Sequence, residues 1–280
     1  MIPFLPSQTA EVVCWMRAAE HRRAPAVRIV DDPYAAAFLS LPYRASLRVS
    51  GLVPAPAWDV LGLSTYVTTR HRYIDDAVLA AGPIDQVVLL GAGYDARLYR
   101  LPLASARRFE VDHPSTGARK AARVAAHPTL PPVAVVRVPV DFATESLRER
   151  LLACGFEPGR RTCWVWEGVS MYLDRAAVVA TTSTLRDLSG PGSRLAMDWL
   201  GSPTGSDAGA AVHRVLPSVL GWVGEPVTLA VSPDESRALL AECGFRVIDL
   251  AEAGSLEQRY VRDGRRAYPH MYALTAELAG

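Results

Sequence analysis

The sequence Gln86-Val87-Val88-Leu89-Leu90-Gly91-Ala92-Gly93-Tyr94-Asp95-Ala96-Arg97 decides the fold. Its apolar part, 87–90, predicts a buried strand, and the residues after the turn predict the start of a helix. Gly91 and Gly93 carry no side chain at the point where the backbone must turn and approach a ligand closely. A glycine-rich turn between a strand and a helix is typical of α/β domains that bind nucleotide-containing cofactors.

Downstream of this turn, short apolar runs alternate with helical patterns. Strands are predicted at 87–90, 108–111, 133–138, 163–166, 194–197, 246–250 and 268–274. Helices are predicted at 115–126, 144–153, 174–188 and 233–243. Because this alternation is typical of parallel sheets covered by helices, we expect a Rossmann-like α/β fold: a seven-stranded, mostly parallel sheet with helices on both faces.

Residues 1–85 predict an N-terminal helical cap that contributes to the cofactor site. Helices are expected at 8–22, from Asp31-Asp32-Pro33 onward and at 65–80, with an irregular connection over 40–63. Residues 86–280 are expected to form the cofactor-binding catalytic domain. Near its end, 201–231 has Gly, Ser and Pro at both ends of a helical middle, which is typical of a substrate lid inserted into the domain. The whole chain is expected to be one compact unit.

The composition excludes several classes of partner. The 280 residues carry 30 basic and 29 acidic side chains, a formal net charge of +1, so bulk attraction to nucleic acid or to an acidic membrane is not expected. The four cysteines are widely spaced and form no metal-binding pattern. With no signal peptide and no apolar run of about 20 residues, we expect a cytoplasmic protein. We expect it to be a monomer or a homodimer. Lys120 is the only lysine, and the arginine-rich composition indicates a GC-rich genome.

Three carboxylates follow predicted strands: Asp112, Asp141 and Glu167. Ligands of open parallel sheets bind at the carboxyl ends of the strands, so these side chains are expected to line one crevice with Gly91. Asp112 can accept both hydroxyls of a ribose. Asp95 would repel a pyrophosphate, which favours a sulfonium nucleoside over a dinucleotide. The glycine spacing still fits a dinucleotide fingerprint, so an NAD-dependent oxidoreductase stays open as an alternative.

These motifs resemble the leucine carboxyl methyltransferase family of class I S-adenosylmethionine-dependent enzymes, whose bacterial members include O-methyltransferases of polyketide and other secondary metabolism. The resemblance runs through most of the chain. Its segments are Thr9-Ala10, Arg17-Ala18-x-Glu20, Asp32-Pro33-x-Ala35, Arg70-x-Arg72-x-Ile74-Asp75-Asp76, 86–101, 109–114, 140–142 and 167–173. Two positions depart from the commoner family pattern, Ala96 in place of threonine and His113 in place of glutamine.

The resemblance implies S-adenosylmethionine as the cofactor and gives a role to each rim residue. Gly91 and Gly93 would contact the cofactor backbone, Asp112 the ribose, and Glu167 the amino group of the methionine part. Arg70, with help from Arg17, would bind its carboxylate. The implied cofactor-binding set is Arg17, Arg70, Gly91, Ala92, Gly93, Asp112, His113, Asp141, Phe142 and Glu167, in which Asp141 and Phe142 hold the adenine. No metal is expected.

The methyl acceptor is expected to lie between the lid and the strand ends. The candidate acceptor-binding residues are Tyr66, Tyr172, Trp199, His213 and Trp222, of which Tyr172 and His213 are also candidate catalytic residues. A carboxylate acceptor is already ionised at neutral pH and needs no base, whereas a phenol would benefit from one. We expect an O-methyltransferase acting on a small-molecule carboxylate of a polyketide-like or other secondary metabolite. A phenol, enol or nitrogen acceptor is the alternative, and a non-enzymatic partner protein is a third class.

Overall fold

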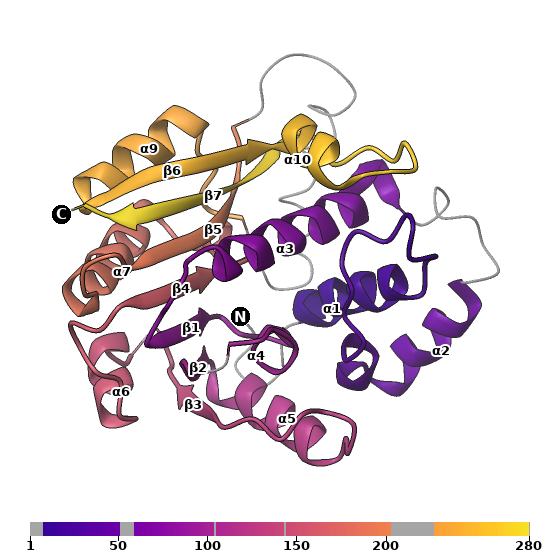
Figure 1. The fold of residues 1–280 in the computed structure, drawn as a ribbon, viewed down its shortest axis with the longest axis horizontal. Coiled ribbons are helices and arrows are strands. Elements are labelled where there is room, and N and C mark those ends of the chain that lie inside the picture. Colours follow the sequence, from indigo (N-terminus) through magenta and orange to yellow (C-terminus); the bar gives the residue numbers. More distant parts are fainter. Residues whose placement is uncertain (1–7, 51–58, 104, 143, 203–226, 280) are drawn as a thin grey trace.

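A seven-stranded sheet with the order β3-β2-β1-β4-β5-β7-β6 forms the centre of the molecule (Figure 1). The computed structural model describes residues 8–50, 59–103, 105–142, 144–202 and 227–279. The strands are β1 (Gln86–Leu90), β2 (Arg107–Asp112), β3 (Val135–Pro139), β4 (Thr162–Trp166), β5 (Arg194–Leu200), β6 (Phe245–Glu252) and β7 (Met271–Leu278). β1 to β5 pair in parallel, and β7 pairs antiparallel with both β5 and β6. The predicted Rossmann-like α/β class is therefore confirmed.

Helices cover both faces of this sheet (Figure 1). The α-helices are α1 (Gln8–His21), α2 (Leu41–Ser50), α3 (Leu63–Leu79), α4 (Arg97–Arg100), α5 (Pro114–Ala125), α6 (Leu147–Ala153), α7 (Arg175–Leu188), α9 (Pro233–Glu242) and α10 (Ala253–Tyr260). Short 3-10 turns occupy η1 (Ala35–Phe38), η3 (Val60–Gly62) and η4 (Ser170–Tyr172). Among the described helices, none combines the length and the apolar character that crossing a membrane requires.

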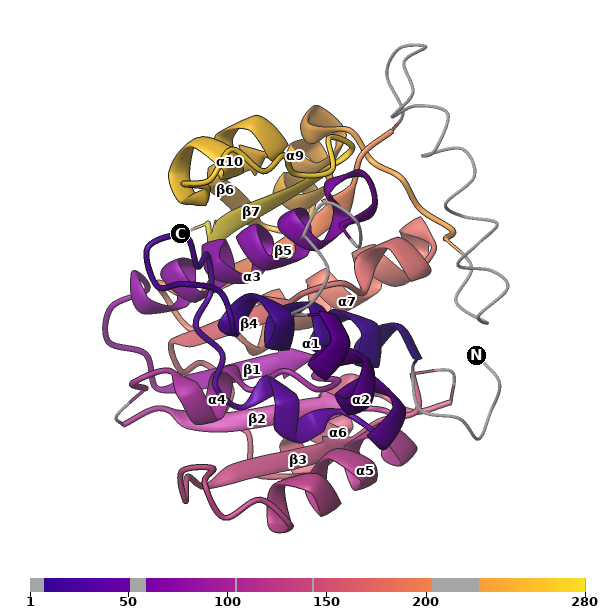
Figure 2. The ribbon, with the colours of Figure 1, turned by 90° about the vertical axis from the view of Figure 1, so that its right-hand side faces the viewer.

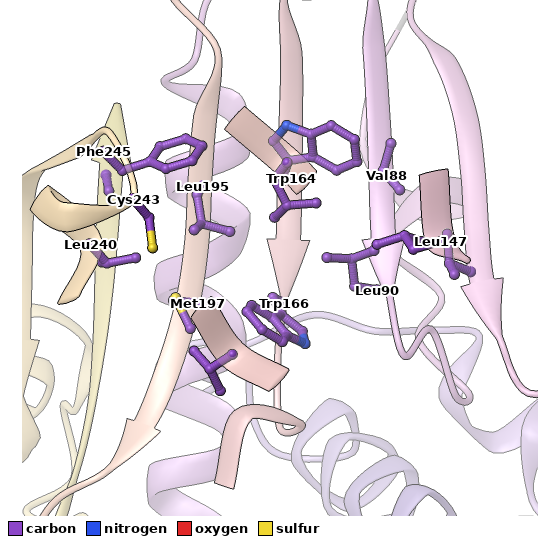
Figure 3. Packing of buried hydrophobic residues seen from close by; sticks show 14 of the residues in the cluster. Val88, Leu90, Leu147, Trp164, Trp166, Leu195, Met197, Leu240, Cys243 and Phe245 are labelled. Carbon is purple, nitrogen blue, oxygen red and sulfur yellow. The ribbon is translucent and has the colours of Figure 1, made fainter. Parts of the chain in front are cut away.

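The central strands are buried on both faces, which explains their continuous apolar sequences. On one face, Val88, Trp164, Trp166 and Met197 pack in a core that α6, α7 and α9 cover (Figure 3). On the other face, neighbours such as Val87, Leu89 and Val165 pack against α3 and α10. Side chains alternate between faces along each strand, so the two cores together fix the register of the sheet and the place where each strand ends.

The N-terminal helices lie at the edge of the sheet where the parallel strands end (Figures 1 and 2). α1 contacts α2, α3 and η1, around a third core that includes Cys14, Ala18 and Phe38. The irregular connection predicted for 40–63 is wrong over 41–50, which form α2. Pro42 lies in the first turn of that helix, where proline is tolerated because its missing N–H has no helical partner, and Leu47 is buried.

The helix predicted to start after the glycine turn is a single turn, α4. α10 was absent from the sequence prediction, because its eight residues with a glycine in the first turn produce no clear helical pattern. Residues 203–226 of the expected lid lie outside the described residues. The described part, 227–231, passes beside the end of β5, where the Val231 N–H donates to the Leu200 carbonyl.

Candidate active site

A cavity of about 380 Å³ lies where β1, β2 and β4 end. Thr9, Ala10 and Val13 of α1 close it from the outside, and α3 supplies Arg70 and His71. The remaining walls come from the glycine turn after β1, the end of β2 and the segment after β4. The cap and the sheet therefore build this cavity together, at the position where open α/β sheets bind their ligands.

The glycine turn forms one wall of the cavity and needs its glycines. Gly91 has φ of 66°, and a Cβ at this position would lie 2.5 Å from Cγ2 of Val169. Gly93 has φ of 43°, and its Cβ would lie 3.3 Å from the Cβ of Ala10 in α1. Both the positive φ and the close neighbours favour glycine, so the turn can approach α1 and the ligand closely.

Asp112 at the end of β2 is tied to the glycine turn. Its Oδ2 accepts a hydrogen bond from Gly93 N at 2.5 Å, and its Oδ1 accepts one from His113 N at 2.7 Å. Burial raises the pKa of Asp112 above its ordinary value, although the two amide donors act in the opposite direction. A carboxylate accepts about four hydrogen bonds, so both oxygens of Asp112 retain capacity for a pair of ribose hydroxyls.

Glu167, directly after β4, is surrounded by three donors. Arg70 Nε lies 3.0 Å from its Oε1, while Arg97 Nη2 and His71 Nδ1 lie 2.8 and 3.1 Å from its Oε2. Burial by itself would raise the pKa of Glu167, but neighbouring His71 and the guanidiniums of Arg70 and Arg97 hold that pKa well below its usual range. Arg70 also donates to Asp198 of β5 at 2.8 Å, so it bridges two strand ends.

His71 is held by arginines on both ring nitrogens. Arg100 Nη2 lies 3.0 Å from Nε2 of His71, and an arginine can only donate. Arg97 Nη2 likewise lies 3.0 Å from Nδ1 of His71, so whichever ring nitrogen carries no proton already faces an arginine donor. Asp75, one turn further along α3, accepts from Arg97 Nε at 2.8 Å and pairs with Arg100 at 2.7 Å.

Arg17 and Asp95 also line the cavity and belong to the same network of ion pairs and hydrogen bonds. Arg17 Nε donates to Asp32 at 3.1 Å, and its Nη2 donates to the Tyr94 carbonyl at 2.7 Å. Asp95 pairs with Arg97 at 2.5 Å. Burial opposes ionisation of Asp95, but Arg97 and neighbouring positive charge lower its pKa to about 2. Asp32 and Asp95 therefore remain ionised at neutral pH.

The network holds more carboxylates than guanidiniums. Its four guanidiniums are Arg17, Arg70, Arg97 and Arg100, and its five carboxylates are Asp32, Asp75, Asp95, Glu167 and Asp198. Carboxylates therefore outnumber guanidiniums by one, and Asp112 adds another carboxylate in the same cavity. Such a cavity attracts a ligand with net positive charge and repels a pyrophosphate.

The same cluster also places His71, Asp95 and Glu167 close enough for a shared metal ion, with donor atoms within 4.8 Å of one another. However, Arg70 and Arg97 already donate to these carboxylates. A divalent cation would have to enter beside two buried guanidiniums, which is electrostatically unfavourable. We therefore assign no metal to this cluster.

The family model for leucine carboxyl methyltransferase matches residues 10–186 of the chain. The chain belongs to the leucine carboxyl methyltransferase family. A relative from Mycobacteroides abscessus, named "Putative S-adenosyl-L-methionine-dependent methyltransferase", is 32% identical over 274 residues, which cover 91% of this chain and 86% of the relative. A relative of the same description from Parafrankia sp. is 37% identical over 199 residues, covering 68% of this chain but only 62% of the relative's length.

A solved structure shares the fold of this family member at low identity. The protein, titled a putative methyltransferase from Thermobifida fusca, has a TM-score of 0.59 and 17% sequence identity, and the match covers 98% of this chain and 96% of that one. Together with the family match, these relatives make the chain a methyltransferase that uses S-adenosylmethionine. The oxidoreductase alternative was therefore wrong, and the glycine fingerprint alone was a misleading signal for NAD.

The structure brings most of the expected cofactor residues of this methyltransferase into one cavity. Its lining includes Arg17, Arg70, Gly91, Ala92, Gly93, Asp112, His113, Phe142 and Glu167. Phe142 is half exposed at the rim. Asp141 does not line the cavity formed by the described residues, and its backbone N–H donates to Glu145. The expected contact between Asp141 and adenine therefore stays a prediction.

The expected acceptor residues are only partly in place. Tyr172 lines the cavity, whereas His213 and Trp222 lie outside the described residues. Tyr66 and Trp199 are buried, and neither lines the cavity that the described residues form. Trp199 packs in the core of the sheet, and the ring of Tyr66 lies under the Arg70 guanidinium, 5.5 Å from its centroid. Their expected role toward the acceptor stays a prediction.

Sequence reasoning placed Asp95 near the cofactor but did not identify His71, Arg97 or Asp198 as parts of the binding network. The signal for His71 is that the polar residues Thr68, Thr69, Arg70 and His71 are consecutive and all buried in α3. Buried polar side chains need partners, so a polar run on a helix against an apolar sheet indicates a polar site. Arg97 and Asp95 belong to the family motif, but their mutual ion pair is visible only in three dimensions.

The raised pKa of Asp112 predicts an acid-dependent loss of cofactor affinity. We expect the affinity for S-adenosylhomocysteine to fall as pH decreases through this pKa, which lies above the ordinary value of about 3.9, because the protonated carboxyl is a weaker acceptor. Asp95 and Glu167, whose pKa values are lowered, stay ionised over this range. Calorimetric titration across pH measures the effect. An acid limb of unchanged size in Asp112→Asn would assign it instead to another group, such as Asp198.

Proposed function

We propose that this methyltransferase transfers the methyl group to a carboxylate oxygen of a small, largely apolar molecule. The observation that carries the proposal is the state of the histidines in the cavity. Both His71 and His113 already use their basic nitrogen: an arginine donor lies 3.0 Å from each ring nitrogen of His71, and His113 Nδ1 accepts from Ser115 N at 3.3 Å. Neither can take a proton from an acceptor while these hydrogen bonds persist.

Glu167 and Asp95, the carboxylates beside His71, offer no better base. Glu167 and Asp95 have lowered pKa values and are held by guanidiniums, so they bind protons only weakly. An acceptor that reaches this part of the site must therefore be nucleophilic without losing a proton there. A carboxylic acid, with a pKa of about 4, is ionised at neutral pH, whereas a phenol, with a pKa of about 10, is not.

The cavity supports the placement of the cofactor in its negatively charged half. S-adenosylmethionine carries a sulfonium, an ammonium and a carboxylate, a net positive charge that suits the excess of carboxylates around Glu167. Arg70 and Arg17 would hold its carboxylate, Glu167 its ammonium and Asp112 its ribose. When bound, its sulfonium supplies the activated methyl group for an in-line displacement.

The apolar side chains of the same cavity would hold the acceptor. Val13 of α1 and Val169, Tyr172 and Leu173 of the segment after β4 line the cavity. These side chains offer an apolar surface with one hydroxyl, suited to the hydrocarbon body of a small acid. Their role is to exclude water and to align the carboxylate oxygen with the methyl group. A secondary metabolite of the polyketide type has this combination of apolar body and carboxylate.

The proposal is tested by identifying the bond that forms. Purified protein is incubated with methyl-labelled S-adenosylmethionine and a panel of apolar carboxylic acids, phenols and amines. We expect label transfer to a carboxylic acid, giving a product that releases labelled methanol in mild base, as a methyl ester does. A base-stable labelled ether or amine would contradict the carboxylate proposal and select the phenol, enol or nitrogen alternative instead. Heat-inactivated protein and omission of the acceptor are the controls.

A further inference from the structure

Lys120, the only lysine in the sequence, lies under the glycine turn. All other basic side chains apart from histidine are arginines, including Arg119 and Arg123 on the same helix, α5. Arg119 is exposed, but Lys120 is buried, with 1% of its surface accessible. Burying an ammonium is unfavourable unless its donors find acceptors, so the contacts of Lys120 require an explanation.

The Lys120 ammonium meets three acceptors. Its Nζ lies 2.8 Å from Oε1 of Glu110 in β2, and it donates to the carbonyls of Asp95 at 2.6 Å and Ala92 at 3.4 Å. Ala92 and Asp95 flank Gly93, the residue whose N–H donates to Asp112. The three donors of one ammonium therefore connect both sides of the glycine turn to the neighbouring strand.

These contacts suit a lysine better than an arginine. An ammonium is a compact charge with three donors in tetrahedral arrangement, whereas a guanidinium is a planar fork suited to two parallel acceptors. The acceptors around Lys120 come from three separate residues, and the Phe38 ring lies 5.9 Å from Nζ. A second cavity, of about 340 Å³, borders Gly93, Glu110, Asp112 and Lys120, so a longer side chain would find space but not the same acceptor geometry.

We propose that Lys120 is a positioning residue for S-adenosylmethionine. Its ammonium holds the carbonyls of Ala92 and Asp95 toward α5 and so fixes the turn in the conformation in which Gly93 N binds Asp112. This keeps the Asp112 carboxylate oriented toward the ribose. The inference rests on the placement of the cofactor at the glycine turn described under the proposed function. It assigns Lys120 a role in affinity without direct contact with the cofactor.

The test compares Lys120→Met and Lys120→Arg with the exposed neighbour Arg119→Met. Loss of Lys120 leaves Glu110 with only the more distant Arg137, 3.9 Å away, as an ion-pair partner and can destabilise the fold by itself. The double variant Lys120→Met, Glu110→Gln therefore removes that carboxylate charge. We expect Lys120→Met and the double variant to bind S-adenosylhomocysteine about tenfold or more weakly than wild type, as for a lost charged hydrogen bond. In these two variants, KM for S-adenosylmethionine should rise while kcat changes little. Lys120→Arg should recover the affinity only in part, and Arg119→Met should bind as tightly as wild type.

Wild-type affinity in a folded double variant would overturn the proposal and leave Lys120 as a core ion pair only. Failure of the wild-type protein to bind S-adenosylhomocysteine would instead contradict the cofactor placement on which the inference rests. A second measurement uses the single lysine: protein labelled with 13C-lysine gives one ε-CH2 signal in NMR spectra. We expect that signal to shift when S-adenosylhomocysteine is added to saturation. An unchanged signal would show that the turn and Lys120 do not respond to the cofactor, against the proposal.

Discussion

Arg97→Met is expected to lower the free energy of unfolding by about 3–5 kcal/mol, the cost of leaving buried charges uncompensated. Arg97 is fully buried and donates to Asp75, Asp95 and Glu167. Methionine fills most of the volume but supplies no donor, so all three carboxylates lose a partner. Urea denaturation measures the change, and a lower midpoint with an unchanged slope would attribute it to stability.

The matched control is Arg72→Met on α3. Arg72 also pairs with an aspartate, Asp76, at 2.9 Å, but both side chains are about 40% exposed. Exposed ion pairs contribute about 0–1 kcal/mol, so this variant should unfold close to wild type. Equal effects of the two substitutions would contradict the assignment of Arg97 as the centre of the buried network.

Asp112→Ala is expected to weaken binding of S-adenosylhomocysteine by about 1–3 kcal/mol, or about 5- to 150-fold. The variant removes the acceptor for the ribose hydroxyls and also the partner of Gly93 N, which holds the glycine turn. Because the folded-state pKa of Asp112 is raised, its ionised form is disfavoured by folding at neutral pH. The alanine variant should therefore lose affinity without a large loss of stability.

Calorimetric titration and thermal unfolding of the same preparation separate these two effects. The control is Asp187→Ala, an exposed aspartate of α7. Among the described ion pairs, Asp187 pairs only with its neighbour Arg186. The affinity of Asp187→Ala should equal that of wild type. Unchanged affinity in Asp112→Ala would overturn the assignment of the ribose to Asp112.

Much of the fold could be predicted because its strands are short apolar runs buried on both faces. The 87–90 run and the turn after it give β1 and the place of the cofactor, and 163–166 likewise gives β4. In contrast, α2 lies next to several prolines and glycines, and α10 is too short to show a helical period. Their helical conformation depends on tertiary contacts, such as burial of Leu47 and Leu256, that periodicity alone does not reveal.

The carboxylates at the rim of the site could be predicted from the strands that they follow. Asp112 and Glu167 follow strands directly, so their place at one edge follows from parallel pairing. The network behind them could not be predicted in this way. Arg97 joins α3, α4 and the end of β4, and Asp198 joins β5 to Arg70 and the Gly168 N–H. These contacts depend on how far each helix lies from the sheet, which one sequence does not specify.

The central feature of this protein is a cavity that binds S-adenosylmethionine or its demethylated product and rejects a phosphorylated dinucleotide. Calorimetric titration of the wild-type protein with S-adenosylhomocysteine, NADH and NADPH tests this claim. We expect one molecule of S-adenosylhomocysteine to bind per chain with micromolar affinity, and no heat of binding from either dinucleotide. Binding of NADH or NADPH without S-adenosylhomocysteine would contradict the charge balance of the site and the placement of the cofactor at Asp112 and Glu167.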